Sequence, residues 1–147
     1  PRLWGMGGLS SSAVASFSAA WHRPDRFGKV LSFIGSYVNI HGADAYPSLV
    51  RKSTPRPTRV YLQSGSGDLD NEHGSWPLAN QQMAAALRYR GWDHHLEFGD
   101  GGHDTNEPAR LLPEALTWLW RDWPDPDGAT WTVEPDSTAY RRAIRGS

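Results

Sequence analysis

The chain has 147 residues, and its 15 Lys and Arg nearly balance its 16 Asp and Glu, which leaves a formal net charge of −1 at pH 7. This balance argues against a nucleic-acid-binding module, because such a module presents a concentrated basic face to phosphates. The sequence contains no cysteine, which excludes disulfides, Cys-based zinc sites and a catalytic thiol. It has no apolar stretch approaching the ~20 residues of a membrane-spanning helix, so we expect a soluble protein without a membrane span.

The predicted elements alternate between strands and helices along the chain. In order they are a strand stub (1–8), a helix (11–21), a buried strand (30–35), a loop (37–57), a second buried strand (59–63), a helix (78–89), a third strand (95–98) and a helix (108–123). This alternation predicts an α/β fold, with a mostly parallel sheet of about three to four strands flanked by helices. We assign residues 1–124 to this domain and expect residues 125–147, rich in Pro, Asp and Gly, to form a weakly structured tail.

Polar side chains follow three of the predicted strands. Ser10, Asp68 and His103 each stand in a turn rich in glycine or serine, just after a strand. Functional groups of parallel sheets gather beyond the carboxyl ends of the strands. The chain order Ser, Asp, His is also that of the triad on an α/β-hydrolase sheet. The sequence therefore predicts nucleophilic catalysis by a Ser-Asp-His triad.

Each member of such a triad has a distinct chemical task. A serine hydroxyl is a weak nucleophile at neutral pH, so His103 has to take the proton of Ser10 during attack. Asp68 has to fix the tautomer of the imidazole and stabilise its protonated form. Ser10 also needs a sharp strand-to-helix turn, where the backbone N–H of Ser11 can hold the oxyanion.

Two alternatives stay open for these residues. Ser10 lies in a serine-rich turn before a helix, where a serine more often acts as an N-cap. Asp70 and Asp100 are competing acids for His103, because both lie close to the predicted strand ends. We prefer Asp68 over Asp70 because of its position in the motif.

Other candidate residues concern the substrate pocket and metals. Tyr37 and Trp76 follow predicted strand ends, which makes them candidates for lining a substrate pocket or for packing in the core. His94 and His95 are neighbours at the start of a strand, and adjacent strand residues point to opposite faces. We therefore expect no metal site, and the predicted chemistry needs no cofactor.

The segments around these residues resemble the esterase family that contains the enterochelin (siderophore) esterases, within the α/β-hydrolase superfamily. The resemblance runs over about 8–124 and rests on segments 10–11, 17–21, 23–32, 35–36, 62–71, 76–83 and 101–103. It implies the α/β-hydrolase fold and ester hydrolysis without a cofactor. Carried over residue by residue, it implies that Ser10 is the nucleophile, Asp68 the acid and His103 the general base.

The resemblance covers only the C-terminal half of that fold, since the chain begins at the nucleophile elbow. Where the family usually has glycine, this chain has Ser12 and Ala13. We expect a half-sheet with an open edge at its first strand, which offers a route to self-association. The second oxyanion donor would come from the missing half, and losing one donor costs ~2.7–4 kcal/mol, a factor of ~100–1000 in turnover. The isolated chain is therefore expected to be a feeble esterase.

The sequence thus predicts a serine ester hydrolase that acts on a small-molecule ester through an acyl-enzyme. A thioesterase or acyltransferase using the same triad remains open, and the sequence does not select the ester or acyl group. The alternative is a non-catalytic α/β-hydrolase remnant that serves as a binding or interaction module. The compartment is not readable from the sequence, and a cytoplasmic location is only the working expectation.

Overall fold

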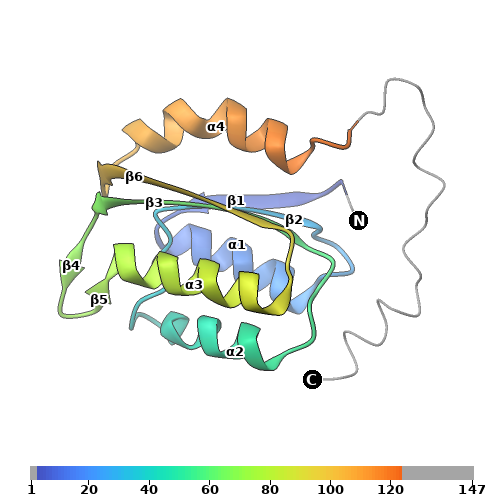
Figure 1. Cartoon of the computed structure of the whole chain (residues 1–147), viewed down its shortest axis with the longest axis horizontal. Helices are drawn as coiled ribbons and strands as arrows, with labels where there is room; N and C mark the ends of the chain where they lie inside the picture. Colours follow the sequence, from blue (N-terminus) through green and yellow to red (C-terminus); the bar gives the residue numbers. More distant parts are fainter. Residues whose placement is uncertain (1–2, 124–147) are drawn as a thin grey trace.

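The computed structural model describes residues 3–123, which form a parallel sheet with helices on both faces (Figure 1). The sheet has four strands in the order β1-β2-β3-β6. They are β1 (Gly5–Leu9), β2 (Lys29–Phe33), β3 (Arg59–Gly67) and β6 (His94–Gly102), and a short antiparallel pair is formed by β4 (Asp70–Asn71) and β5 (Gly74–Ser75). The predicted α/β fold with a parallel half-sheet is confirmed. The tail expected at residues 125–147 lies outside the described residues.

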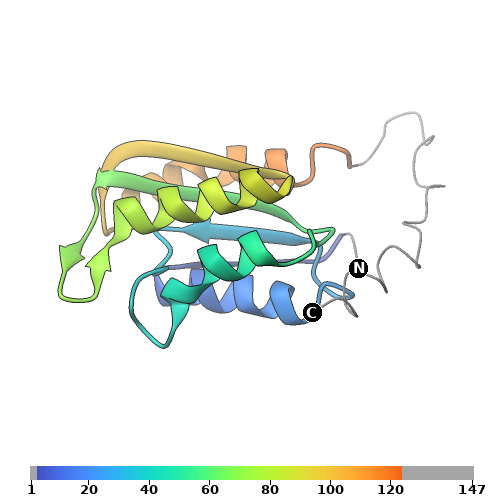
Figure 2. The same ribbon diagram turned by 60° about the horizontal axis from the view of Figure 1, so that its bottom comes forward.

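The helices form two layers around the sheet. On one face lie α1 (Ser11–His22) and α3 (Trp76–Arg90), with the short α2 (Tyr46–Lys52) between them on the outside (Figure 2). On the other face lies α4 (Asn106–Leu119) (Figure 1). Strand β2 is buried along its whole length because both of its faces are covered. None of the helices within residues 3–123 is long and apolar enough to cross a bilayer.

Each layer has its own core. The larger core includes Phe17, Tyr37, Leu62, Met83 and Leu87, and it lies between the sheet and the layer of α1, α2 and α3. The smaller one lies under α4, whose inward face carries Leu111, Ala115 and Leu119. Those three side chains recur at the helical spacing that predicts one buried face.

The loop predicted for residues 37–57 contains two helical segments, which is a correction. A 3-10 turn, η1 (Ala43–Ala45), leads directly into α2. Pro47 lies in the first turn of α2, where its missing N–H costs no helical hydrogen bond, so this proline begins a helix rather than preventing one. The ring of Tyr46 packs edge-on against Phe17, with the ring centroids 5.1 Å apart, and this contact ties α2 to α1.

Strands β3 and β6 extend further than the sequence predicted, because glycines read as turns are part of the strands. β3 continues to Gly67 and β6 to Gly102, with a shift in register between Gly65 and Gly67. A Cβ atom at Gly65 would collide with the backbone of Gly101. Glycine is thus required for the two backbones to lie this close, and the irregular pairing redirects the end of β3.

Strand β1 lies at the edge of the sheet. Within residues 3–123 it pairs with β2 alone, in parallel register from Gly5 opposite Lys29 to Leu9 opposite Phe33. An edge strand keeps unpaired backbone groups that another strand can join. Self-association through this edge stays a prediction.

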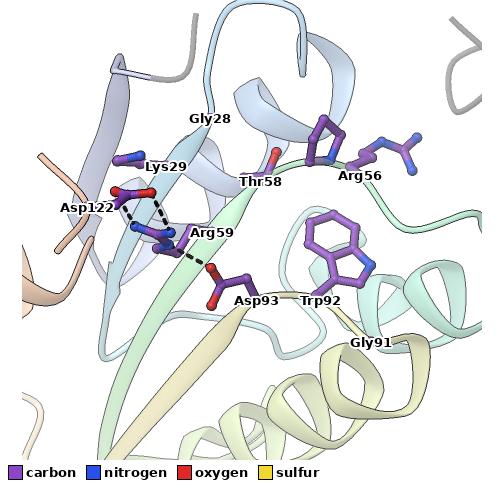
Figure 3. A pocket seen from close by; sticks show the side chains of 10 residues that line it. Gly28, Lys29, Arg56, Thr58, Arg59, Gly91, Trp92, Asp93 and Asp122 are labelled. Atoms are coloured by element: carbon purple, nitrogen blue, oxygen red, sulfur yellow. Dashed lines mark hydrogen bonds and ion pairs between the residues drawn. The ribbon is translucent and has the colours of Figure 1, made fainter. Parts of the chain in front are cut away.

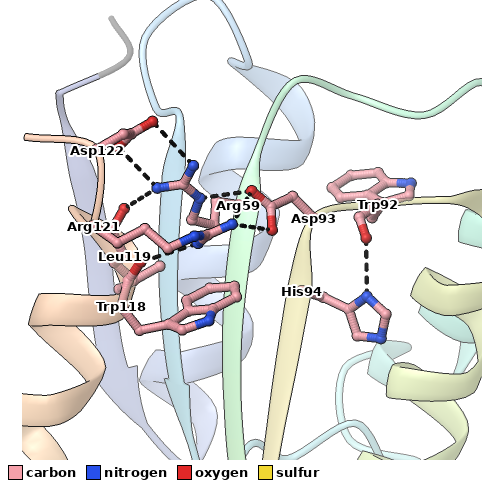
Figure 4. Close-up of polar contacts among 8 residues, drawn as sticks. All are labelled: Arg59, Trp92, Asp93, His94, Trp118, Leu119, Arg121 and Asp122. Carbon is pink, nitrogen blue, oxygen red and sulfur yellow. Dashed lines mark hydrogen bonds and ion pairs between the residues drawn. The ribbon is translucent and has the colours of Figure 1, made fainter.

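The amino end of the sheet is fastened to the end of α4 by an ionic cluster (Figure 4). Arg59, on β3, donates to Asp93 at 2.7 Å, to Asp122 at 3.0 Å and to the Leu119 carbonyl oxygen at 2.6 Å. Burial opposes the ionisation of Asp93, but the hydrogen bonds from Arg59 and Arg121 outweigh it and lower the pKa of this carboxyl. The hydrogen bond from Arg59 likewise lowers the pKa of Asp122.

Candidate active site

Three side chains predicted from the sequence meet at the carboxyl end of the sheet. Ser10 directly follows β1, Asp68 follows β3 and His103 follows β6. The Nε2 atom of His103 lies 2.9 Å from the Ser10 hydroxyl oxygen, and its Nδ1 atom lies 2.6 Å from a carboxylate oxygen of Asp68. The parallel sheet thus places Ser10 and His103 in contact although 93 positions separate them. Asp68 and His103 follow β3 and β6, which are direct neighbours in the sheet.

Ser10 stands on a strained turn between β1 and α1. It is the N-cap of α1, with φ 56° and ψ −123°, a region that non-glycine residues rarely adopt. The turn needs Gly8, because a Cβ there would lie 2.5 Å from the backbone of Ser12. The Ser12 hydroxyl donates to the Leu9 carbonyl oxygen at 2.7 Å and accepts from the Leu9 N–H at 2.9 Å. Ser12 therefore joins the end of the strand to the first turn of the helix.

Asp68 is held in place by hydrogen bonds other than the one to His103. Its carboxylate has no exposed surface, and it accepts hydrogen bonds from the Leu69 N–H at 2.7 Å and the Ser64 hydroxyl at 3.4 Å. The His103 side chain is 21% exposed, and the Trp76 ring packs nearly perpendicular to the imidazole, with the ring centroids 5.7 Å apart. A buried carboxylate that is fixed in this way can hold the imidazole in one orientation.

The first turn of α1 provides the candidate oxyanion donor. The first backbone N–H groups of a helix have no acceptor within the helix, and the helix dipole favours negative charge there. Ser11 supplies the first of these groups and lines a cavity of about 370 Å³ beside Ser10. The cavity lies between α1 and the η1–α2 segment, and its walls also include Val14, Ala15, Ser18, Ser36, Ile40, His41, Gly42, Ala43, Tyr46 and Leu49.

The two aromatic candidates have different positions. Trp76 lies at the site, where its Nε1–H donates to the Ser36 hydroxyl and its ring contacts His103. Tyr37 packs in the large core, 2% exposed, with its hydroxyl hydrogen-bonded to Ser32 at 3.0 Å. Burial raises the pKa of Tyr37 well above its usual value. The structure therefore places Tyr37 away from the cavity, as a core residue.

The competing acids and the histidine pair lie elsewhere. Asp70 is on β4 and Asp100 is near the end of β6, and both are exposed, whereas the ring nitrogens of His103 bond to Ser10 and Asp68. His94 bonds to the Trp92 carbonyl oxygen, and His95 pairs with Glu97. Among residues 3–123 no group of three or more His, Asp or Glu side chains is arranged to hold a metal ion.

One residue at the site was assigned no role from the sequence. The Ser36 hydroxyl oxygen lies 3.0 Å from that of Ser10, and the Ser36 N–H donates to the Ser10 carbonyl oxygen at 3.2 Å. Its position after β2, in a Gly-Ser turn at a predicted strand end, was the available signal. Sequence alone gives no means of telling that this turn folds back onto Ser10.

A second cavity, of about 460 Å³, lies at the opposite end of the sheet (Figure 3). Residues at the amino ends of β2, β3 and β6 line it, including Thr58, Arg59 and Asp93. Two of these, Arg59 and Asp93, belong to the ionic cluster described above. Arg59 and Asp93 are therefore already engaged in holding α4, and the cavity shares no residue with the triad.

Solved structures of esterases share this arrangement of strands and helices. An enterobactin esterase of Shigella flexneri, solved in the presence of enterobactin, matches 79% of this chain with a TM-score of 0.66 and 27% identity. The chain is built like part of such an esterase. A ferric enterobactin esterase of Salmonella typhimurium matches 79% of the chain at a TM-score of 0.59 and 22% identity, and a ferulic acid esterase matches 82% at 0.66 and 17%. The last two show the fold alone.

The matches are partial on the side of the known proteins. This chain covers 51% of the ferulic acid esterase and 30% of each enterobactin esterase. No protein-family model matches the sequence, and neither does any curated protein. The expected resemblance to enterochelin esterases is confirmed as a partial α/β-hydrolase-like fold.

Proposed function

We propose that this chain is a serine ester hydrolase in which Ser10 is the nucleophile, His103 the general base and Asp68 the residue that orients His103. The observation that carries the proposal is the pair of hydrogen bonds, 2.9 and 2.6 Å, that joins the three side chains in the order a triad requires. The strained backbone of Ser10 supports it, because such strain concentrates at functional sites.

Acylation follows from this geometry. The Ser10 oxygen attacks the ester carbonyl carbon while its proton passes to Nε2 of His103, along the 2.9 Å hydrogen bond. The carbonyl oxygen of the tetrahedral intermediate takes the negative charge and is held by the Ser11 N–H. The intermediate then collapses, the bond to the alcohol oxygen breaks, and His103 gives its proton to the departing alcohol.

Deacylation repeats the sequence with water. His103 takes a proton from a water molecule, whose oxygen attacks the acyl carbon of the ester on Ser10. When this second intermediate collapses, the bond between the acyl carbon and the Ser10 oxygen breaks, and His103 returns the proton to that oxygen. The products are the carboxylic acid and the free enzyme, so no cofactor enters the balance.

The cavity beside Ser11 is the proposed site for one side of the substrate. Its volume of about 370 Å³ suits a small-molecule group, and its walls combine apolar side chains such as Val14 and Ile40 with the hydroxyls of Ser18 and Tyr46. The Ser11 N–H is the oxyanion donor that we assign within residues 3–123.

A fluorophosphonate probe tests the proposal directly, because it reacts with activated serines. We expect covalent labelling of the wild-type chain, with the modified peptide containing Ser10, and no labelling of Ser10→Ala. Ser53→Ala, at the C-cap of α2 and away from the triad, is the matched control and is expected to label like the wild type. Absence of labelling in the wild type, or labelling that survives Ser10→Ala, would favour the non-catalytic binding module instead.

A further inference from the structure

We propose that Ser36 is a further catalytic residue of this site: its hydroxyl donates a hydrogen bond to the Ser10 oxygen and thereby directs the Ser10 proton to His103. The inference rests on the proposed function, because it assigns a role to a neighbour of the proposed nucleophile. It starts from a hydroxyl pair, 3.0 Å apart, whose donor and acceptor can be deduced from the groups on either side.

The hydrogen bond between Asp68 and His103 determines where the hydroxyl hydrogen of Ser10 points. The Asp68 carboxylate accepts, so Nδ1 of His103 carries the hydrogen in their 2.6 Å bond. In the neutral imidazole the other nitrogen, Nε2, is then an acceptor. Ser10 must therefore donate its single hydroxyl hydrogen to His103, and its oxygen is left to accept from Ser36.

The hydrogen bond from Trp76 to Ser36 also indicates that Ser36 donates to Ser10. An indole N–H only donates, so Ser36 accepts from Nε1 of Trp76 at 3.1 Å. The Ser36 hydrogen is then available for Ser10, 3.0 Å away. Trp76 and Ser36 are both buried, 3% and 2% exposed, so there is little room for a water molecule to replace either of these hydrogen-bond partners. Hydrogen bonds thus run in one direction from Trp76 through Ser36 and Ser10 to His103.

The turn that carries Ser36 is held by three hydrogen bonds. Ile34 has a φ of 43°, unusual for a β-branched residue, and its N–H donates to the Gln63 carbonyl oxygen on β3 at 2.7 Å. The fully buried amide of Asn80, on α3, donates to the Gly35 carbonyl oxygen at 2.9 Å. The Ser36 N–H donates to the carbonyl oxygen of Ser10 itself. These three hydrogen bonds, together with the strained backbone of Ile34, therefore fix the position of the Ser36 hydroxyl.

The chemical effect follows from where negative charge develops. As the Ser10 proton moves to His103, the Ser10 oxygen gains negative charge until its bond to the carbonyl carbon forms, and it regains that charge when it leaves during deacylation. A fixed donor stabilises such charge without reorganising at that moment. The Ser36 donor also keeps the Ser10 hydroxyl from rotating away from His103.

The first test measures labelling by the fluorophosphonate probe, separating the maximal rate of inactivation from the probe concentration at half-maximal rate. Ser36→Ala is expected to lower the maximal rate about tenfold, the effect of one lost hydrogen bond, with little change in the half-maximal concentration. Ser36→Thr keeps a hydroxyl and is expected to restore most of the rate. Trp76→Phe, which removes the donor behind Ser36, is expected to fall between them.

The second test needs no reaction and so keeps the inference testable if the wild-type chain does not label. In protein labelled with ¹⁵N-histidine, at a pH where the imidazole is neutral, the Nε2 resonance of His103 reports the hydrogen bond from Ser10. Ser10→Ala defines the shift of a nitrogen that has lost this bond. Ser36→Ala is expected to move the resonance part of the way toward that value, and Ser36→Thr to leave it near the wild-type position.

The results separate the two proposals. Labelling in Ser36→Ala at the wild-type rate, with an unchanged Nε2 resonance, overturns the role of Ser36 while the triad proposal stands. An equal loss in Ser36→Ala and Ser36→Thr, both folded by circular dichroism, also overturns it, because packing of the turn would then matter rather than the hydroxyl. A wild type that never labels, with the expected shift in Ser36→Ala, refutes the esterase and keeps the hydrogen-bond direction.

Discussion

The two ends of the sheet are built in opposite ways. At the carboxyl end, backbone strain and the hydrogen bonds among Ser10, Ser36, Asp68 and His103 dominate. The three non-glycine residues with positive φ among those described, Ser10, Ile34 and His41, all lie in the loops at this end. At the amino end Arg59 and its carboxylate partners form an ionic cluster that fastens α4 to the strands (Figure 4). The comparison indicates that one end positions reactive groups at some cost in stability, and the other end contributes to stability.

Strain at the carboxyl end has to be compensated by packing elsewhere. A residue held in a sparsely populated backbone region costs about 1–3 kcal/mol. The buried strands and the two cores supply the compensation, since β2 is buried along its length and Leu62, Met83 and Leu87 are fully buried. Substitutions at the two ends should therefore separate activity from stability.

The largest expected effect is on reactivity, at Asp68. Asp68→Asn removes the charge that fixes the His103 tautomer, and we expect labelling at Ser10 to slow by at least ~10³-fold. Asp70→Asn and Asp100→Asn are the matched controls, because both residues are exposed and lie outside the hydrogen bonds of His103. The measurement is the rate of labelling by the fluorophosphonate. A labelling rate that falls as much in Asp70→Asn as in Asp68→Asn would contradict the assignment of Asp68 as the acid.

The largest expected effect on stability is at the opposite end. Arg59→Ala removes the hydrogen bonds to Asp93, Asp122 and the Leu119 carbonyl oxygen, and we expect the free energy of unfolding to fall by about 2 kcal/mol. The labelling rate of the folded variant should stay within twofold of the wild type. Urea unfolding followed by circular dichroism measures the first quantity.

A control for the arginine substitution is Arg110→Ala. Arg110 pairs with Glu107 on the surface of α4, where its side chain is 64% exposed. Exposed pairs contribute about 0–1 kcal/mol, so little loss is expected. Equal losses for Arg59→Ala and Arg110→Ala would show that the cluster has no special role.

A smaller effect on stability is expected at the strained elbow. Ser10→Gly relieves the positive φ, whereas Ser10→Ala keeps a Cβ in the same conformation. We therefore expect the glycine variant to be the more stable of the two by about 1 kcal/mol, and neither to label. At Ala15, inside α1, the order should reverse, because glycine in a helix is less stable than alanine by about 0.5–1 kcal/mol. Chemical unfolding of the two pairs provides the comparison.

The smallest expected effect is the pH dependence of the ionic cluster. The pKa of Asp93 lies below its usual value in the folded protein, so the ionised carboxylate stabilises the fold at pH values above the ordinary carboxyl range of about 4. As the pH falls through the lowered value, the carboxylate gains a proton and this contribution is lost. Asp93→Asn should thus lower the melting temperature at pH 7, and the difference from wild type should shrink below pH ~4.

The control for this pH series is Asp70→Asn, since Asp70 is exposed on β4 at the other end of the sheet. Thermal unfolding monitored from pH 7 to pH ~2.5 compares the three proteins. A difference between wild type and Asp93→Asn that persists unchanged at the lowest pH would mean that the charge of Asp93 does not stabilise the fold. Such a result would also weaken the contrast between the two ends.

Local sequence pattern was sufficient for the alternation of elements and for the candidate triad. Ser10, Asp68 and His103 were identified because each follows a predicted strand in a turn rich in glycine or serine, because they occur in the chain order Ser, Asp, His, and because the segments around them resemble the esterase family. Helix α2 was missed because its proline was read as a breaker, although Pro47 lies in the first turn. Whether a proline begins or ends a helix depends on residues around it that only the packed chain fixes.

By itself, then, the sequence determined the α/β class, the strand ends at which polar side chains gather and the three residues proposed for catalysis, because periodicity and turn chemistry act over a few neighbouring residues. The tertiary structure alone decided that Ser36 faces Ser10, that Tyr37 belongs to the core and that Gly65 lies against the backbone of β6. These are contacts between segments that meet only after the strands have paired, and no local pattern records which way a side chain faces across that gap.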